Sequence, residues 1–85
     1  MSTRENIEPV FQKALELIDL REEIYGDSWK TSGPTVCMAE VVRKGNYVRA
    51  QWERGKCDTE KFAEDLLDLI NWSAYAYWHV TGEAK

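Results

Sequence analysis

The side chains of this chain that suit chemistry are carboxylates on two helical segments. The first segment offers Glu22, with Glu23 and Asp27 as further candidates, and the last offers Glu64, Asp65 and Asp68. Carboxylate oxygens are the ligands that Mg²⁺ prefers. Bound Mg²⁺ neutralises a polyphosphate and orients an attacking water. For Glu22, a structural ion pair is the alternative, because a carboxylate at the margin of an apolar face needs a partner.

Cations and aromatic rings accompany these acids. The cations that could hold phosphate oxygens are Arg21, Lys30, Arg43 and Lys44. Aromatic rings stack on nucleobases. None of these features is specific by itself, because small acidic helical proteins often carry carboxylates at helical spacing.

Turn and capping residues divide the 85-residue chain into three helices that must position these side chains. Asn6 suits the start of the first helix, with Pro9 in its first turn, and Gly26 suits its end. The stretch TSGPT at 31–35 separates the first two helices, and Asp58 or Thr59 caps the third. We therefore predict a single all-α domain, a three-helix bundle with helices near 6–25, 35–54 and 59–81. So small a domain has a thin core, which favours completion by oligomerisation.

Helical periodicity assigns a buried face to each helix. The residues predicted to be buried are Ile7, Val10, Phe11, Ala14, Ile18 and Tyr25 in the first; Met38, Val41, Gly45, Val48 and Trp52 in the second; and Phe62, Leu66, Leu69, Ile70, Ser73, Ala74 and Tyr77 in the third. Gly45 within its seam suggests a close helix crossing. The opposite face of the third helix is acidic yet carries Trp72, Tyr75 and His79, so a second subunit or a ligand should cover it.

Charge and composition exclude several function classes. The formal net charge of −4 argues against a broad DNA- or RNA-binding surface. The two cysteines have no zinc-site spacing and fit a reducing compartment. The N-terminus lacks an apolar signal core, and the apolar run at 66–80 is too short to span a membrane. These features predict a cytoplasmic protein without a membrane partner.

Two motifs carry a family resemblance. YGDSW at 25–29 follows the first helix, and DLLDLINWSAYAYW at 65–78 lies in the last. Together they resemble the small all-α MazG-like nucleotide pyrophosphohydrolase group, most closely its phage-borne branch with a YG-x-x-W turn. The resemblance runs from about Ala14 to Trp78. The chain departs from the group's E-E-x-x-E motif, because Gly26 stands three residues beyond Glu23 and Asp27 comes one position later.

The resemblance implies a Mg²⁺ site between two acidic pairs and a pocket completed by two subunits. Carried over, the metal ligands are Glu22, Glu23, Asp65 and Asp68, with Glu22 and Asp68 as the catalytic residues. The YGDSW turn would close the pocket, with Asp27 or Ser28 capping a helix or contacting phosphate. The full set expected to bind the nucleotide is Tyr25, Asp27, Ser28, Trp29, Lys30, Arg43, Lys44, Tyr47, Asn71, Trp72 and Tyr75.

Three functions remain open at this level. The first is a Mg²⁺-dependent nucleoside-triphosphate pyrophosphohydrolase that works as a homo-oligomer. The second is a phage protein that needs no metal and sequesters a cyclic or other signalling nucleotide made by bacterial anti-phage defence. The third is a structural adaptor whose exposed aromatics join subunits. A hydrolase needs both acidic pairs within reach of one metal, whereas a sequestering protein needs a closed basic and aromatic pocket.

Overall fold

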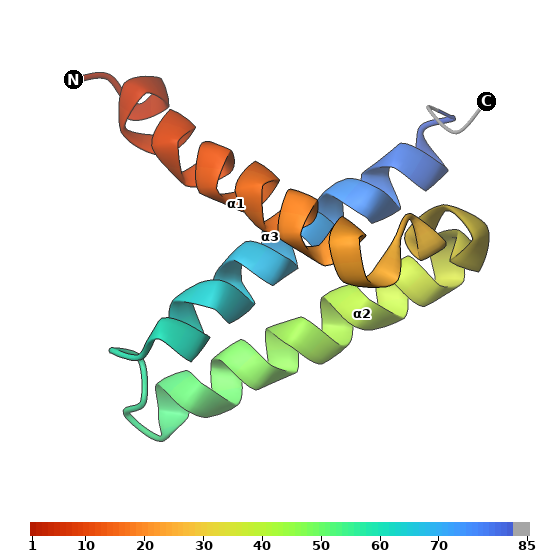
Figure 1. Cartoon of the computed structure of the whole chain (residues 1–85). Coiled ribbons are helices and arrows are strands. Elements are labelled where there is room, and N and C mark those ends of the chain that lie inside the picture. Colours follow the sequence, from red (N-terminus) through yellow and green to blue (C-terminus); the bar gives the residue numbers. More distant parts are fainter. Residues whose placement is uncertain (83–85) are drawn as a thin grey trace.

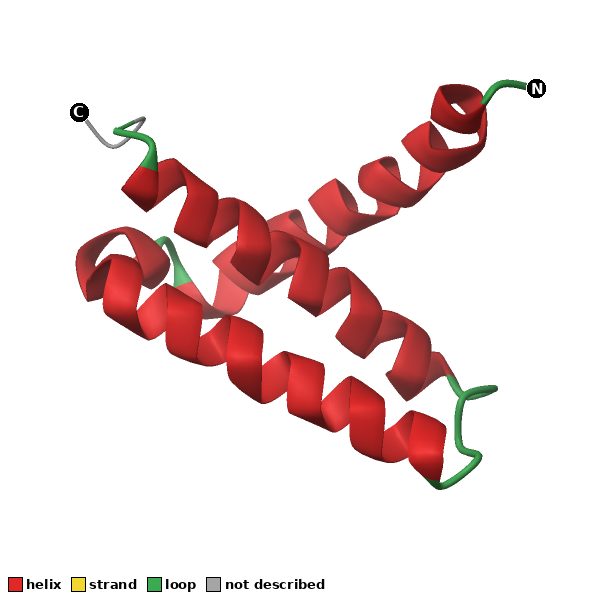
Figure 2. Cartoon of the chain, turned by 180° about the vertical axis from the view of Figure 1, so that it is seen from behind, coloured by secondary structure: helices red, strands yellow, loops and turns green. Residues whose placement is uncertain are grey.

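The computed structural model describes residues 1–82, which form three α-helices. Helix α1 spans Thr3–Tyr25, α2 spans Ser28–Glu53 and α3 spans Glu60–Val80. Helices α2 and α3 lie antiparallel side by side, and α1 crosses one face of that pair (Figure 1; Figure 2). The predicted all-α, three-helix architecture is confirmed. None of the helices within residues 1–82 has the length and apolar content of a membrane span.

Helix α1 begins earlier than the sequence suggests. Ser2 is its N-cap: the Ser2 hydroxyl accepts a hydrogen bond from the Glu5 backbone N–H, and the Glu5 carboxylate accepts one from the Ser2 N–H, each at 3.2 Å. This reciprocal pair satisfies two N–H groups that a helix start leaves without partners. The predicted start at Asn6 was therefore wrong, and Pro9 lies inside α1.

Helix α2 also starts early, and two glycines explain how. Gly26 (φ 62°) ends α1, and its N–H donates to the Glu22 carbonyl. A first helical turn begins at Ser28, and Gly33 (φ 85°, ψ 175°) then interrupts the helix before Pro34. Positive φ values are adopted readily only by glycine. The predicted boundary at residue 35 thus marks this break, and YGDSW forms a corner that carries Trp29 back toward α3. The predicted start of α3 is confirmed within one residue, with Thr59 as its cap.

The packing of α3 differs from the prediction. Its buried residues are Asp65, Asp68, Asn71 and Ala76, whereas Leu66, Ser73, Ala74 and Tyr77, which we expected in the core, are exposed. The acidic face is covered by α2 of the same chain, because Lys44 and Gln51 supply partners for its carboxylates. Polar side chains that satisfy one another can occupy a helix interface.

The predicted faces of α1 and α2 are only partly buried. In α1, Ala14 and Leu17 are buried and Ile18 is half-buried. In α2, Val41, Gly45 and Val48 are half-buried. Predicted core residues that the chain leaves exposed are Ile7, Val10, Phe11, Tyr25, Met38 and Trp52. Within residues 1–82, a Cβ atom at Gly45 would meet nothing within 4 Å, so a close crossing does not account for this glycine.

A buried hydrogen bond fixes the point where α1 crosses α3. The Asn71 side-chain amide donates from Nδ2 to the Ala14 carbonyl oxygen at 2.9 Å. Asn71 is 5% exposed and Ala14 is 2% exposed, so the bond is shielded from water. Since Ala14 lies about one turn before Ile18 and two before Arg21, this contact sets where the C-terminal end of α1 lies beside α3.

Candidate functional site

A cavity of about 370 Å³ lies where the C-terminal end of α1 meets the first half of α2 and the second half of α3. Its walls bring together side chains that are far apart in the sequence. The residues that line it are Ile18, Arg21, Glu22, Tyr25, Gly26, Ser28, Trp29, Glu40, Arg43, Lys44, Asp68, Asn71, Trp72 and Tyr75. A cavity of this size falls within the range of small-molecule sites in proteins.

Most of the residues predicted to bind a nucleotide line this cavity. They are Tyr25, Ser28, Trp29, Arg43, Lys44, Asn71, Trp72 and Tyr75. Three do not line it. Asp27 occupies the N-cap position of α2 but makes no capping hydrogen bond through its side chain, and its carboxylate lies 3.4 Å from Lys30 Nζ. The third, Tyr47, is outside the cavity lining, but its hydroxyl lies 3.2 Å from Nη1 of Arg43, which does line the cavity. Lys30 is thus outside the lining as well.

An aromatic cluster holds the YGDSW corner against α3. The Trp29 ring stacks on Tyr75 with centroids 4.4 Å apart and planes 11° apart, and it meets Trp78 edge-on. The Trp29 carbonyl oxygen lies 3.0 Å from His79 Nε2. Each aromatic pair adds roughly 0.5–1.5 kcal/mol beyond its burial. Trp29, Trp72 and Tyr75 therefore form a fixed wall of rings beside the charged part of the cavity.

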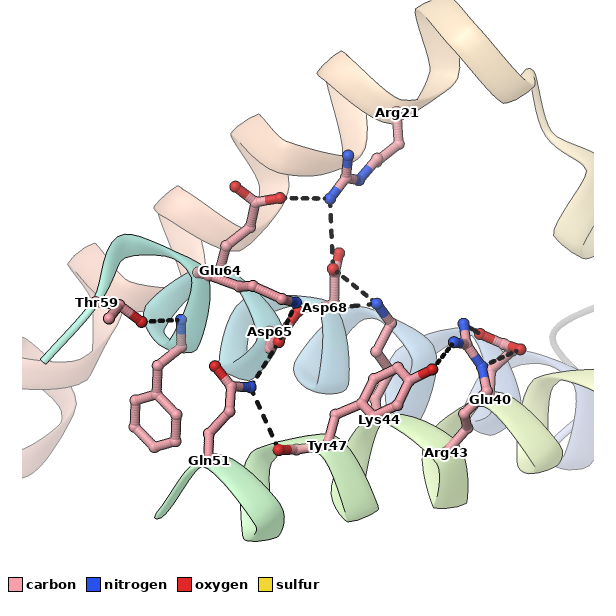
Figure 3. Close-up of polar contacts among 12 residues, drawn as sticks. Arg21, Glu40, Arg43, Lys44, Tyr47, Gln51, Thr59, Glu64, Asp65 and Asp68 are labelled. Atoms are coloured by element: carbon pink, nitrogen blue, oxygen red, sulfur yellow. Dashed lines mark hydrogen bonds and ion pairs between the residues drawn. The ribbon is translucent and has the colours of Figure 1, made fainter. Parts of the chain in front are cut away.

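The charged part of the cavity centres on Asp68. One of its oxygens lies 3.4 Å from Arg21 Nη2 and 3.3 Å from Lys44 Nζ. Arg21 also pairs with Glu64 at 2.7 Å. Figure 3 shows Arg21 from α1 and Lys44 from α2 converging on Asp68 of α3. All three helices thus contribute to one ion-pair network at the cavity wall.

The four predicted metal ligands do not gather at one point. Glu22 and Asp68 both line the cavity. Asp65 is buried outside it, where Lys61 Nζ and Gln51 Nε2 lie 2.9 and 2.8 Å from one of its oxygens. Glu23 is exposed. Among residues 1–82 there is no group of three or more His, Cys, Asp or Glu side chains placed to hold a metal ion.

The pKa of Tyr75 is raised by its surroundings in the cavity. Burial raises the pKa of its phenol, and the negative charges of Glu22 and Asp68 raise it further. On the far wall, the hydrogen bond from Arg43 lowers the pKa of Glu40 more than burial raises it. Burial acts to lower the pKa of Arg21, but the charge of Asp68 and the bond to Glu64 outweigh it. These shifts favour the charged forms of Glu40 and Arg21 in the cavity wall.

Asp65 makes stability sensitive to acid. Burial acts to raise the pKa of its carboxyl, but hydrogen bonds from Lys61 and Gln51 outweigh burial and hold that pKa below its usual range. A lowered folded-state pKa adds stability at pH values above the unfolded-state pKa of ~3.9, and this contribution is lost as the pH falls through the folded-state pKa. We expect Asp65→Asn to lower the free energy of unfolding at neutral pH by about 1–3 kcal/mol and to flatten its decline below about pH 4.

Denaturant unfolding of both proteins across acidic pH measures this effect. The matched control is Asp19→Asn on the exposed side of α1, which should keep the wild-type acid slope. Parallel slopes for wild type and Asp65→Asn would contradict the assignment.

Comparison of the chain with protein-family models, curated proteins and solved structures gave no match.

Sequence reasoning missed several residues of the site. Glu40 and Ile18 line the cavity. Arg21 was selected as a phosphate-binding cation, but its bonds to Glu64 and Asp68 were not predicted. Trp78 belongs to the aromatic cluster. Their positions in the sequence could have identified them. Ile18 and Arg21 lie within one turn of Glu22 on α1, and Glu40 lies one turn before Lys44 on α2.

Proposed function

We propose that the protein binds a nucleotide in the α1–α2–α3 cavity and hydrolyses its phosphate chain with Mg²⁺. The observation that carries this proposal is the set of side chains that line this cavity. Two carboxylates from different helices, Glu22 and Asp68, share the cavity with three cations and with the Trp29, Trp72 and Tyr75 rings. Rings that take a base, next to cations that take phosphates, form the arrangement that nucleotides need.

The charge balance of the cavity favours a metal-bound nucleotide over a bare one. Arg21, Arg43 and Lys44 are matched by the carboxylates that line the same cavity, Glu22, Glu40 and Asp68. A polyphosphate entering alone would meet no excess of positive charge. Mg²⁺ binds proteins through one or two carboxylates together with substrate phosphates and waters. The proposal therefore uses Glu22 and Asp68 alone and gives up the expected requirement for both acidic pairs.

Individual roles follow from position. Glu22 has no ion-pair partner within residues 1–82, so its carboxylate is available to hold Mg²⁺ or to take a proton from water. Asp68 would be the second ligand, held in place by Lys44 and Arg21. Arg43 and Lys44 would bind phosphate oxygens. Mg²⁺, when bound, would supply Lewis-acid polarisation of the phosphate.

One observation favours a second function, nucleotide binding without hydrolysis. Asp68 already contacts Arg21 and Lys44, and Asp65 already contacts Lys61. These cations compete with a metal for the same oxygens. A protein that sequesters a signalling nucleotide would need the rings and cations of the cavity but no metal.

A thermal-shift screen with product analysis tests the proposal. Purified protein is mixed with linear and cyclic nucleotides, each in Mg²⁺ and in EDTA. The hydrolase predicts stabilisation by a nucleoside triphosphate in Mg²⁺ and release of pyrophosphate or phosphate. Stabilisation in EDTA by a nucleotide that is recovered intact supports sequestration instead. No shift with any nucleotide would overturn both and favour the structural adaptor.

The proposal extends to assembly and setting. We infer a MazG-like bundle that a second copy of the chain completes, since few apolar side chains are buried within one copy. Such a homo-oligomer would act on small molecules in the bacterial cytoplasm, during phage infection if the gene is phage-borne.

A further inference from the structure

A second concave surface lies on the other side of the α1–α3 crossing. It is a groove of about 750 Å³ between these two helices. Its lining residues are Phe11, Ala14, Leu15, Ile18, Leu66, Leu69, Ile70, Asn71, Ser73, Ala74 and Tyr77, none of which is charged. Phe11 and Leu15 are each 54% exposed, and Tyr77 is 65% exposed. The cores of protein–protein interfaces are likewise depleted of charged residues.

The chain exposes more surface than an average monomer of its mass. The chain exposes 6377 Å². A folded monomer of 9.9 kDa exposes on average only about 5,200 Å². The excess of roughly 1,200 Å² exceeds the ~800 Å² that each partner buries in a standard protein interface. Burial of one standard interface would therefore bring the exposed area of each copy closer to the average for a chain of this mass.

The shape of the fold favours a second copy over another occupant. The N-terminal half of α1 projects away from α2 and α3 (Figure 1; Figure 2). It carries Ile7, Val10 and Phe11 at helical spacing, all exposed, so the chain presents an apolar ridge beside an apolar groove. A two-fold axis lets the same patch serve on both copies, with each ridge facing the other's groove.

We propose that the α1–α3 groove is the interface of a two-fold dimer and that dimer formation positions the α1 wall of the nucleotide cavity. Ile18 and Asn71 line both the groove and the cavity. A partner packed against the groove would hold α1 on α3 and so fix Arg21, Glu22 and Tyr25. The inference deepens the proposed homo-oligomer, but it does not depend on nucleotide binding.

Analytical ultracentrifugation without nucleotide tests the interface independently of the proposed activity. Wild type should sediment at twice the monomer mass of 9.9 kDa at micromolar concentration. Ala74→Glu places a charge in the groove and should give a monomer. The matched control, Val42→Glu, changes an exposed apolar residue of α2 outside the groove and should remain a dimer.

A measurement on wild type covers the case in which Ala74→Glu fails to fold. Isotope-filtered NMR on a mixture of labelled and unlabelled chains should show intermolecular contacts between the Phe11 or Tyr77 rings and the Leu66 or Leu69 methyl groups. A monomeric wild type, with or without an apolar small molecule in the groove, would overturn the proposal. So would a dimer that lacks these contacts, or one that Val42→Glu dissociates and Ala74→Glu does not.

Discussion

Lys44→Met should weaken the binding of a nonhydrolysable nucleoside triphosphate by about 10- to 100-fold. The Lys44 ammonium lies in the cavity wall, and its side chain is 16% exposed. A hydrogen bond between charged groups contributes roughly 1.5–3 kcal/mol, and each ~1.4 kcal/mol is a tenfold change in affinity. Methionine keeps most of the apolar stem and removes the charge, so the change acts on the phosphate contact.

The control for Lys44→Met must separate lost binding from lost stability. Lys61→Met serves, because Lys61 pairs with Asp65 at 2.9 Å but does not line the cavity. It disturbs the same acidic face and should leave affinity unchanged in isothermal titration calorimetry. Equal losses in both variants would show that Lys44 acts through stability and not by contact with phosphate.

Glu22→Gln should lower the rate of hydrolysis by about 100-fold or more while the nonhydrolysable analogue still binds. Removal of a group that moves a proton or orients water costs roughly 10²–10⁴-fold in rate. Binding should persist because the amide keeps the shape of the side chain and removes a negative charge facing the phosphates. The measurement is kcat for pyrophosphate or phosphate release in Mg²⁺, set beside the dissociation constant of the analogue.

Glu16→Gln provides the matched control for Glu22→Gln. Glu16 is an exposed acid of α1 that does not line the cavity, so this variant should hydrolyse at the wild-type rate. Turnover by Glu22→Gln at the wild-type rate would rule out Glu22 as the catalytic carboxylate. An inactive wild type that binds as tightly as both variants would assign the cavity to sequestration.

The helices were predictable because the residues that cap and end them act locally. Thr59 caps α3 through a bond to the Phe62 N–H, and Gly26 ends α1 with a positive φ, both of which the sequence indicates directly. The start of α1 was missed because Ser2, four residues ahead of the expected cap Asn6, forms a capping box with Glu5. Helix α2 starts at Ser28 and is interrupted at Gly33. The sequence signals around Gly33 predicted the start of the helix there, when they mark a break inside it.

The face of α3 that packs on α2 was not predictable from periodicity. Apolar spacing favours Leu66, Ala74 and Tyr77 as core, but these line a groove that one copy leaves open. The buried face depends on cations from other helices, since Lys44 and Arg21 partner Asp68 across 24 and 47 positions of sequence. Periodicity within one helix carries no information about such partners.

Many of the residues that we selected from the sequence for the candidate site share one cavity. Trp29, Arg43, Lys44 and Tyr75 were selected for chemical type and for the family resemblance, and all line one cavity. The unplaced members, among them Asp27 and Lys30, pair with each other at the start of α2. They belong to the first turn of α2, which the break at Gly33 separates from the rest of the helix, and residue types alone do not determine such a break.

NMR mapping of the indole signals during a titration with a nonhydrolysable nucleoside triphosphate and Mg²⁺ tests the central claim most directly. Trp29 and Trp72 line the cavity, whereas Trp52 is 67% exposed on α2 outside it and serves as an internal control. The account predicts saturable shifts of the Trp29 and Trp72 indole N–H signals with an unchanged Trp52 signal. Unchanged Trp29 and Trp72 signals at a saturating concentration, or a shift confined to Trp52, would contradict it.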